Sequence, residues 1–404
     1  MSIRTDRRHL SIIRSHQTKN VIREKLMFLL CFTMIFSCCF FTHNIIVKIT
    51  SLGLLVVFGI KAHLSRINDI GRISYLIGLA FPIILLLIST LNSGDLSSAM
   101  RGSYCAVFFL ALPIIIFYGI PLEKTFEYVM RIVIVLVLGS LLLDLTGRVD
   151  IFTNPLLLFM YENNELAVAT KGAQYLTYWK VFLQADALLI IYGCFCYEKR
   201  KRLWLVLCGL TAWFSGSMAN PIAFIVCIVA MWIENTGKVR LSQVFIIFGL
   251  FTVIAYSIIP FMLTSQDMVI RASALNAYGD ILRDPGILLF GQGYGSEIYV
   301  SARNEFSITT EWSFFEMIRW YGLIGFTLFI AVIVYPFRKL EKTNRRWMVY
   351  AMIGYLTIAY TNPLLYTTTG MVAYIMLYYE FFLAKQEAST YQEEQKTGDK
   401  AYVL

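Results

Sequence analysis

Long apolar runs recur through most of this sequence, and they constrain its fold more than any other feature. A helix that crosses a bilayer needs roughly 20 mostly apolar residues, with a lower limit near 17. About twelve segments meet or approach this length. They lie near 26–42, 44–60, 73–91, 104–120, 126–144, 179–197, 203–218, 219–233, 241–262, 312–335, 346–361 and 364–384. The runs are continuous and do not alternate with polar residues, which favours helices over a β-barrel.

The composition agrees with a membrane protein. Hydrophobic residues make up 58% of the 404 residues and charged residues only 15%, whereas a soluble domain carries about 25% charged residues. Such a chain lacks the polar side chains needed to cover a surface that faces water. We therefore expect an all-α polytopic membrane protein with about 12 transmembrane helices. The short segments 203–218 and 219–233 could instead form one re-entrant hairpin.

The basic residues predict the orientation of the chain. If the N-terminus is cytoplasmic, most of the 35 Lys and Arg face the cytoplasm, as the positive-inside rule requires. They include the run from Lys199 to Arg202 and the basic residues from Arg338 to Arg346. The three expected parts are a basic cytoplasmic arm (1–25), a single membrane domain (26–384) and a polar cytoplasmic tail (385–404). The net charge of +9 is then mostly a topogenic signal, and we expect no nucleic-acid partner.

The cysteines and histidines argue against metal chemistry. All eight cysteines fall within or at the ends of the apolar segments, where cysteine behaves as a small buried apolar residue. The four histidines avoid the two large loops described next. We expect no metal site and no cofactor.

Two connections are long, 145–178 and 263–311, and both are expected on the outer face. Long ordered loops tend to carry function. In the second loop, apolar residues at helical spacing predict an amphipathic helix from Asp267 to Arg283, lying at the membrane surface. The apolar positions are Ile270, Ala274, Ala277 and Ile281. Pro285 and Gly286 are expected to end this helix.

A glycine-rich stretch from Leu288 to Ser296 follows, and its backbone could approach a ligand closely. Charged residues then appear inside predicted spans, where charge is costly and marks functional positions. Glu316 and Arg319, one helical turn apart, could form an intramembrane ion pair or contact substrate. Asp186 could line a polar cleft or pair with Arg131.

The region 267–328 resembles the bacterial O-antigen polymerase and ligase superfamily. The resemblance rests on Arg271 in a loop helix, a P-hydrophobic-hydrophobic-G-x-G-x-G stretch from Pro285 to Gly295, the acidic Glu311, and a Y-G-hydrophobic-hydrophobic-G sequence from Tyr321 to Gly325. Lys171-Gly172 loosely resembles an Arg-x-x-Gly pattern of the family. Ser215 to Ser217 resembles its S-x-S-R element, although Met218 replaces the basic residue.

The resemblance implies a GT-C-like architecture, a multi-pass location in the bacterial inner membrane, and a substrate glycan linked to undecaprenyl diphosphate. In a polymerase, a sugar hydroxyl of one lipid-linked unit attacks the anomeric carbon of another glycan, and the lipid diphosphate leaves. Preorganised cations would stabilise the growing charge on the diphosphate, and a carboxylate could accept the hydroxyl proton. Membrane lipids would surround the enzyme. A chain-length regulator and a flippase of the same pathway would be its protein partners.

These demands assign the candidate site. We expect Glu311, Arg271 and Arg283 to be catalytic, with the two arginines on the diphosphate because their forked donors match its oxygens. The expected substrate-binding residues are Arg303, Lys171, Lys180, Asp186, Gly291, Gly293, Glu316 and Arg319.

Two other functions remain open. One is the related ligase that moves finished O-antigen onto lipid A-core. Ligases of the superfamily typically carry a histidine in the second long loop, where this chain has Glu311 and no histidine, so polymerase is favoured. The other is a flippase or transporter of lipid-linked oligosaccharides, because an even number of spans with both termini inside is common among transporters. Transporters usually contain internal repeats, and this sequence shows none.

Overall fold

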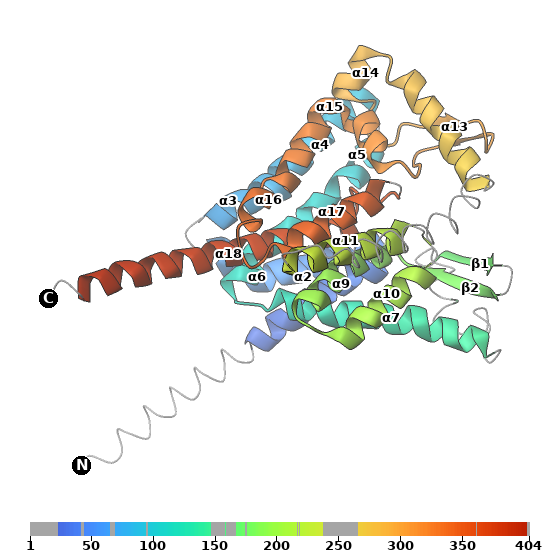
Figure 1. Ribbon diagram of the computed structural model, residues 1–404. Helices are drawn as coiled ribbons and strands as arrows, with labels where there is room; N and C mark the ends of the chain where they lie inside the picture. Colours follow the sequence, from blue (N-terminus) through green and yellow to red (C-terminus); the bar gives the residue numbers. More distant parts are fainter. Residues whose placement is uncertain are drawn as a thin grey trace, which may run out of the picture.

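The computed structural model describes residues 23–41, 44–64, 69–93, 96–146, 158, 167–173, 176–215, 217, 219–236, 266–360 and 362–401. In these ranges the chain forms a bundle of helices with two short β-hairpins (Figure 1). The predicted span near 241–262, the predicted arm up to residue 22 and most of the loop 145–178 lie outside the described residues.

The first half of the chain consists of apolar helices. A helix over 23–40 precedes α2 (Ile45–Leu64). One continuous helical run comprises α3 (Asp69–Tyr75), the π-helical η1 (Leu76–Ala80) and α4 (Phe81–Ser93). A second run comprises α5 (Leu96–Ser103), the 3₁₀-helical η2 (Tyr104–Leu110) and α6 (Ala111–Phe117), and α7 (Leu122–Leu145) follows.

The second half begins with an antiparallel hairpin of β1 (Ala167–Ala173) and β2 (Leu176–Phe182). Next come the 3₁₀-helical η4 (Gln184–Leu188), α9 (Leu189–Glu198), α10 (Arg202–Phe214) and α11 (Ala219–Thr236). The second long loop contains α13 (Gln266–Ile281), α14 (Pro285–Phe290) and a hairpin of β3 (Ile298–Val300) and β4 (Glu305–Ser307). The last helices are α15 (Ser313–Val334), α16 (Phe337–Leu340), α17 (Trp347–Tyr360) and α18 (Thr368–Ala401).

Five helices of the described chain are long and apolar enough to cross a membrane. They are Ile45–His63, Arg72–Asn92, Leu122–Leu145, Ala219–Thr236 and Ser313–Leu340. Each coincides with a predicted span. Three further apolar helices, Tyr104–Phe117, Arg202–Phe214 and Trp347–Tyr360, are shorter than the length that spans a bilayer alone. The structure thus describes an all-α bundle typical of a membrane protein.

Two predicted spans differ from the observed elements. The sixth was expected as a helix from residue 179, but β2 occupies Leu176–Phe182 and the α-helix starts only at Leu189. Aromatic and β-branched residues such as Tyr178 and Val181 favour strands, and an apolar run alone does not distinguish strand from helix. The twelfth was expected to end near 384, but α18 continues as one helix to Ala401 through the predicted polar tail.

The outer surface of the bundle is apolar. Large hydrophobic side chains on several helices are well exposed, among them Val57, Leu91, Leu142 and Val226. Monomeric soluble proteins rarely leave so much contiguous apolar surface in water. This surface suits contact with lipid, and it agrees with the composition.

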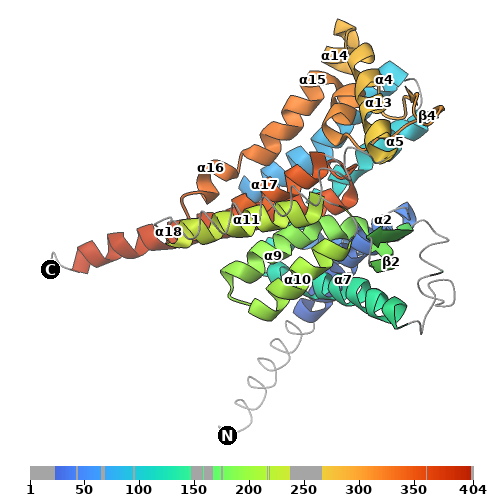
Figure 2. The same cartoon turned by 45° about the vertical axis from the view of Figure 1, so that its right-hand side comes forward.

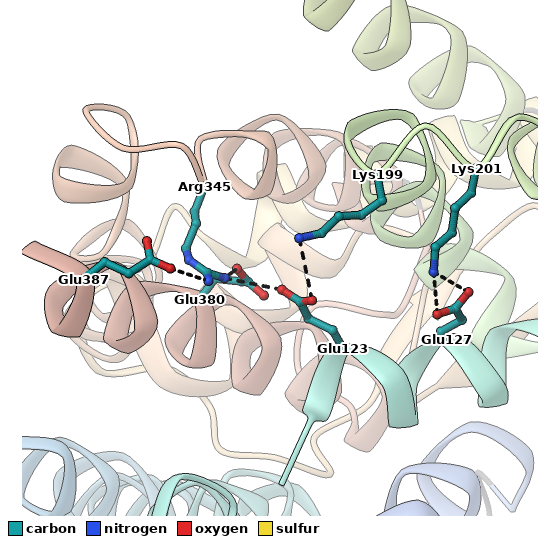
Figure 3. Close-up of polar contacts among 7 residues, drawn as sticks. All are labelled: Glu123, Glu127, Lys199, Lys201, Arg345, Glu380 and Glu387. Atoms are coloured by element: carbon teal, nitrogen blue, oxygen red, sulfur yellow. Dashed lines mark hydrogen bonds and ion pairs between the residues drawn. The ribbon is translucent and has the colours of Figure 1, made fainter. Parts of the chain in front are cut away.

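One end of the bundle holds a network of ion pairs, which we call the charged end (Figure 3). Its members are Glu123, Glu127, Lys199, Lys201, Arg345, Glu380 and Glu387. Lys201 Nζ lies 2.6 Å from Glu127 Oε1, and Arg345 pairs with the fully buried Glu380. Arg345 also lies 3.3 Å from Glu123, so it joins α7 to α18.

The opposite end carries the loops. Both views place the β1–β2 hairpin and the segment with α13, α14 and β4 away from the C-terminus (Figures 1 and 2). We call this the loop end. The described parts of the two predicted outer loops therefore lie at one end. The predicted cytoplasmic residues Lys199, Lys201 and Arg345 lie at the other.

Candidate functional site

The predicted loop helix is present as α13, and its apolar face packs on protein. Ala274 and Tyr278 are buried against Ile298 and Val300 of β3. Trp312 and Phe315, at the start of α15, complete this small core. The apolar face was expected to lie on the membrane surface. That expectation did not include the β3–β4 hairpin, which supplies the apolar partner instead.

Arg271 of α13 forms an ion pair with Glu311, 40 positions later in the chain. The Arg271 side chain is 26% exposed and that of Glu311 37% exposed, so both remain accessible from solvent. Trp312 Nε1 donates a hydrogen bond of 3.0 Å to the Arg271 carbonyl, which fixes α13 beside the pair. The structure thus brings together two of the three predicted catalytic residues.

The third, Arg283, lies elsewhere. Its side chain is 82% exposed and pairs with Asp280 at 3.2 Å, one helical turn away. Arg303 is likewise exposed, in the turn between β3 and β4, and lies 3.5 Å from Glu305. Exposed pairs of this kind contribute little. Neither arginine contacts Glu311 in the described structure.

Residues Pro285–Phe290 form the short helix α14. α13 ends at Ile281, before the predicted stop, and Pro285 begins α14 instead of only ending α13. Asp284 caps α14 by accepting a hydrogen bond of 2.8 Å from the Gly286 N–H. Proline suits the first turn of a helix because the N–H that it lacks would have no helical partner there.

The glycine-rich stretch is joined to a break in α15. Gly322 has φ +67° and ψ 178°, which interrupts the helix and frees carbonyl oxygens in the preceding turn. The N–H of Gln292 donates to the Arg319 carbonyl at 2.6 Å, and the N–H of Gly293 donates to the Trp320 carbonyl at 3.0 Å. The two glycine-containing parts of the resemblance are therefore bonded to each other through the backbone.

This joint requires glycine on both sides. Gly291 has φ +79°, and a Cβ there would collide with the Trp320 carbonyl. A Cβ on Gly322 would collide with the Leu289 carbonyl. Glycine alone combines this backbone conformation with so close an approach.

Arg319 is fully buried and supports the loop end. Its guanidinium donates to the Ser296 carbonyl at 2.5 Å, to the Ser296 hydroxyl at 3.0 Å and to the Ile308 carbonyl at 2.6 Å. Glu316, also buried, accepts from the N–H of Thr310. The expected ion pair between Glu316 and Arg319 is therefore absent from the described structure, because each side chain binds backbone groups of the loop.

Tyr278 completes this network. Its hydroxyl lies 2.8 Å from Thr310 Oγ1. Burial raises the pKa of Tyr278, and the nearby Glu316 carboxylate raises it further, so the hydroxyl stays protonated and can donate. Glu316, Arg319 and Tyr278 together hold residues 308–310, which lead directly into Glu311. We call these three side chains the brace.

A hollow of about 790 Å³ lies beside the glycine-rich stretch. It is bounded by the end of α4, by α14 and by the residues that follow α14. Its lining residues are Leu91, Asn92, Asp284, Gly286, Ile287, Phe290, Gly291, Gln292, Gly295, Ser296 and Glu297. Asn92 of α4 closes one side by donating to the carbonyls of Phe290 and Gly291 at 2.9 and 3.0 Å. Gly291 lines the hollow as predicted, while Gly293 faces the break in α15.

The remaining predicted residues lie outside this region. Asp186 is fully buried and accepts a hydrogen bond of 2.9 Å from the Leu183 N–H, so it caps η4. Arg131 pairs with Glu127 at 2.5 Å and not with Asp186. Lys171 lies on β1 and Lys180 on β2, so Lys180 is not in a membrane helix.

Several residues of the site carried no assigned role in the sequence. Asn92, Tyr278 and Thr310 contribute contacts across long sequence separations. In the sequence, Asn92 is recognisable only as a polar residue just after a predicted apolar span. Tyr278 follows the apolar Ala274 at helical spacing, which predicts burial but not its hydrogen bond.

Among the described residues, no group of three or more His, Cys, Asp or Glu could hold a metal ion. No protein-family model matches this sequence, and a search of curated proteins returned no match.

Proposed function

We propose that this protein is a membrane glycosyltransferase that polymerises polyprenyl-diphosphate-linked oligosaccharide repeats into O-antigen or a similar surface polysaccharide. The reaction would take place at the loop end, on the outer face of the bacterial inner membrane. The proposal rests on the resemblance of residues 267–328 to the O-antigen polymerase and ligase superfamily, on the absence of a histidine from the second long loop, and on the geometry of that region.

One observation carries the proposal. The separated parts of the resemblance meet in one folded unit. Arg271 pairs with Glu311, and the Gly291–Gly293 backbone bonds to α15 at the turn before Gly322. These contacts support the proposal, because residues that act in one site must lie close together in the fold.

The Arg271–Glu311 pair supplies the chemistry that the reaction needs. Oxygens of the incoming diphosphate compete with Glu311 for the guanidinium, since a doubly charged diphosphate attracts arginine strongly. The released carboxylate can accept the proton of the acceptor hydroxyl. The hydroxyl oxygen then bonds to the anomeric carbon, the bond to the diphosphate oxygen breaks, and Arg271 stabilises the charge on the leaving group.

Electrophoresis of the surface polysaccharide tests the proposal. Deleting the gene should leave lipid A-core that carries a single repeat, because transfer to the core and export continue without polymerisation. Loss of all repeats from the core, with glycan stranded on the carrier lipid, would identify a ligase instead. Failure to export even single repeats would identify a flippase. Unchanged long chains would overturn all three readings.

A further inference from the structure

The hollow beside the glycine-rich stretch differs in charge from the Arg271–Glu311 pair. Two carboxylates, Asp284 and Glu297, line it, and none of its lining residues is Lys or Arg. A diphosphate would be repelled by these carboxylates, and no cation is present among the lining residues to offset the repulsion. The hollow therefore does not suit the charged part of a lipid-linked glycan.

The polar atoms of the lining are mainly hydrogen-bond acceptors. Asp284 uses one carboxylate oxygen for the Gly286 N–H, and Glu297 has no ion pair within the described chain. Asn92 uses its amide N–H groups on the carbonyls of Phe290 and Gly291, which leaves its carbonyl oxygen available. Gln292 Oε1 is buried in the wall and has no hydrogen-bond partner among the described residues.

Such a lining fits a ligand rich in hydroxyl donors. Gln292 Oε1 is closed to solvent as it stands, but the residue lines the hollow. If its side chain turns into the hollow, the amide oxygen gains from a ligand hydroxyl the hydrogen bond that it lacks. Phe290, Leu91 and Ile287 add apolar surface on which the C–H face of a sugar ring can lie. A volume of about 790 Å³ falls within the usual range for small-molecule sites.

The wall of the hollow is held in place. Arg319 binds both the carbonyl and the hydroxyl of Ser296, and the Gln292 N–H is bonded to the Arg319 carbonyl. The side chains that face a ligand therefore rest on a braced backbone. A preorganised wall lowers the cost of ordering it on binding.

We propose that this hollow is a subsite for an uncharged sugar of the oligosaccharide repeat, separate from the diphosphate site at Arg271. Asp284, Glu297, Asn92 and Gln292 accept hydrogen bonds from the sugar hydroxyls. This inference rests on the proposed function. It adds that the sugar of the substrate binds in the hollow, while the diphosphate binds at Arg271.

Binding by the purified full-length protein in detergent tests the subsite. The two probes are the free repeat oligosaccharide, released from its carrier lipid by mild acid, and undecaprenyl diphosphate without sugar. The double variant Gln292→Leu with Glu297→Ala removes both side-chain acceptors and keeps the backbone bond of residue 292. Its Kd for the oligosaccharide should rise about tenfold, while its Kd for undecaprenyl diphosphate stays within about twofold. Arg271→Ala should show the reverse pattern.

Asn276→Leu, on the exposed face of α13, is the matched control and should change neither Kd. The single variant Glu297→Ala alters only an exposed side chain, so its folding is not in question, and it should weaken oligosaccharide binding alone. An oligosaccharide Kd that neither Glu297→Ala nor the double variant changes would overturn the subsite. If the wild-type protein then still extends chains, only the subsite is wrong. Failure to bind either probe and to extend chains would reject the proposed function as well.

Discussion

At the scale of single residues, Arg319 is the most informative side chain at the loop end. It is fully buried and forms no ion pair within 4 Å in the described part of the chain, although the Glu316 carboxylate is near enough to interact with its charge. It donates three hydrogen bonds to Ser296 and Ile308. The Trp320 ring centroid lies 5.7 Å from its guanidinium carbon, which adds a cation–π contact. These hydrogen bonds offset part of the cost of burying the charge, although Arg319 Nε has no partner among the described residues. The residue thus fixes the two loop segments that it bridges.

Arg319→Lys tests this role. A lysine keeps the charge but lacks the planar fork that reaches both loop segments. We expect the free energy of unfolding to fall by about 2 kcal/mol, because hydrogen bonds to charged groups contribute roughly 1.5–3 kcal/mol each. Thermal unfolding in detergent measures the loss. Arg202→Lys, at an exposed position, is the control and should leave the Tm unchanged. A wild-type Tm for Arg319→Lys would contradict the bracing role.

Asp186 tests whether a buried carboxylate is structural or binds substrate. Its Oδ2 caps η4, and its Oδ1 has no hydrogen-bond partner within the described chain. Asp186→Asn keeps an acceptor for the Leu183 N–H, so polysaccharide length and Tm should stay normal. Asp186→Ala should lose about 1 kcal/mol, as for other lost helix caps. Short chains in an Asp186→Asn variant with a normal Tm would show that the charge itself is needed for function.

At the scale of elements, the joint between the glycine-rich stretch and α15 organises the site. Gly322→Ala should lower the free energy of unfolding by at least about 2 kcal/mol, because alanine is strained in this backbone conformation and its Cβ meets the Leu289 carbonyl. Gly279→Ala is the matched control. No atom lies within 4 Å of a Cβ built there, and alanine favours a helix by about 1 kcal/mol. Equal Tm values for the two variants would contradict the claim that the joint requires glycine at position 322.

Some elements of this fold could be predicted from the sequence. The apolar periodicity of 266–281 predicted α13, and five bilayer-length helices coincide with predicted spans. The break at Gly322 could not be predicted, because an isolated glycine in an apolar run also occurs in unbroken helices. The β1–β2 hairpin was missed because the end of its second strand, from Trp179 to Phe182, runs directly into the apolar segment that was predicted as the sixth span.

The site was predictable to a similar degree. The resemblance pointed to Arg271 and Glu311, which pair, and to the glycine-rich stretch, which joins α15. Helical spacing predicted a pair between Glu316 and Arg319, and that was wrong. The partners that they bind instead are backbone groups of a loop, and no rule of sequence spacing describes such contacts.

At the scale of the whole molecule, polar contacts concentrate at two opposite ends of an apolar bundle. The charged end gathers Lys199, Lys201 and Arg345 with acidic partners. The loop end carries the hollow, the brace and the Arg271–Glu311 pair. This separation is what a protein needs if one end faces the cytoplasm and the other faces a lipid-linked substrate outside.

Cysteine labelling tests that orientation. All eight native cysteines are buried, so a cysteine added at an exposed site gives the main signal. A membrane-impermeant maleimide should label Asn276→Cys, at the loop end, in intact spheroplasts. It should label Lys342→Cys, between α16 and α17, only after permeabilisation. The opposite pattern would place the loop end in the cytoplasm and exclude the proposed site of reaction.

The most direct test of the central claim uses purified full-length protein in vesicles supplied with polyprenyl-diphosphate-linked repeats, with the products separated on a gel. We predict a ladder of lengthening glycans with release of polyprenyl diphosphate. Arg271→Ala, folded with a near-normal Tm, should reduce the rate at least about a hundredfold. Wild-type protein that leaves single repeats unextended, or an Arg271→Ala variant that builds the full ladder at the wild-type rate, would contradict the account.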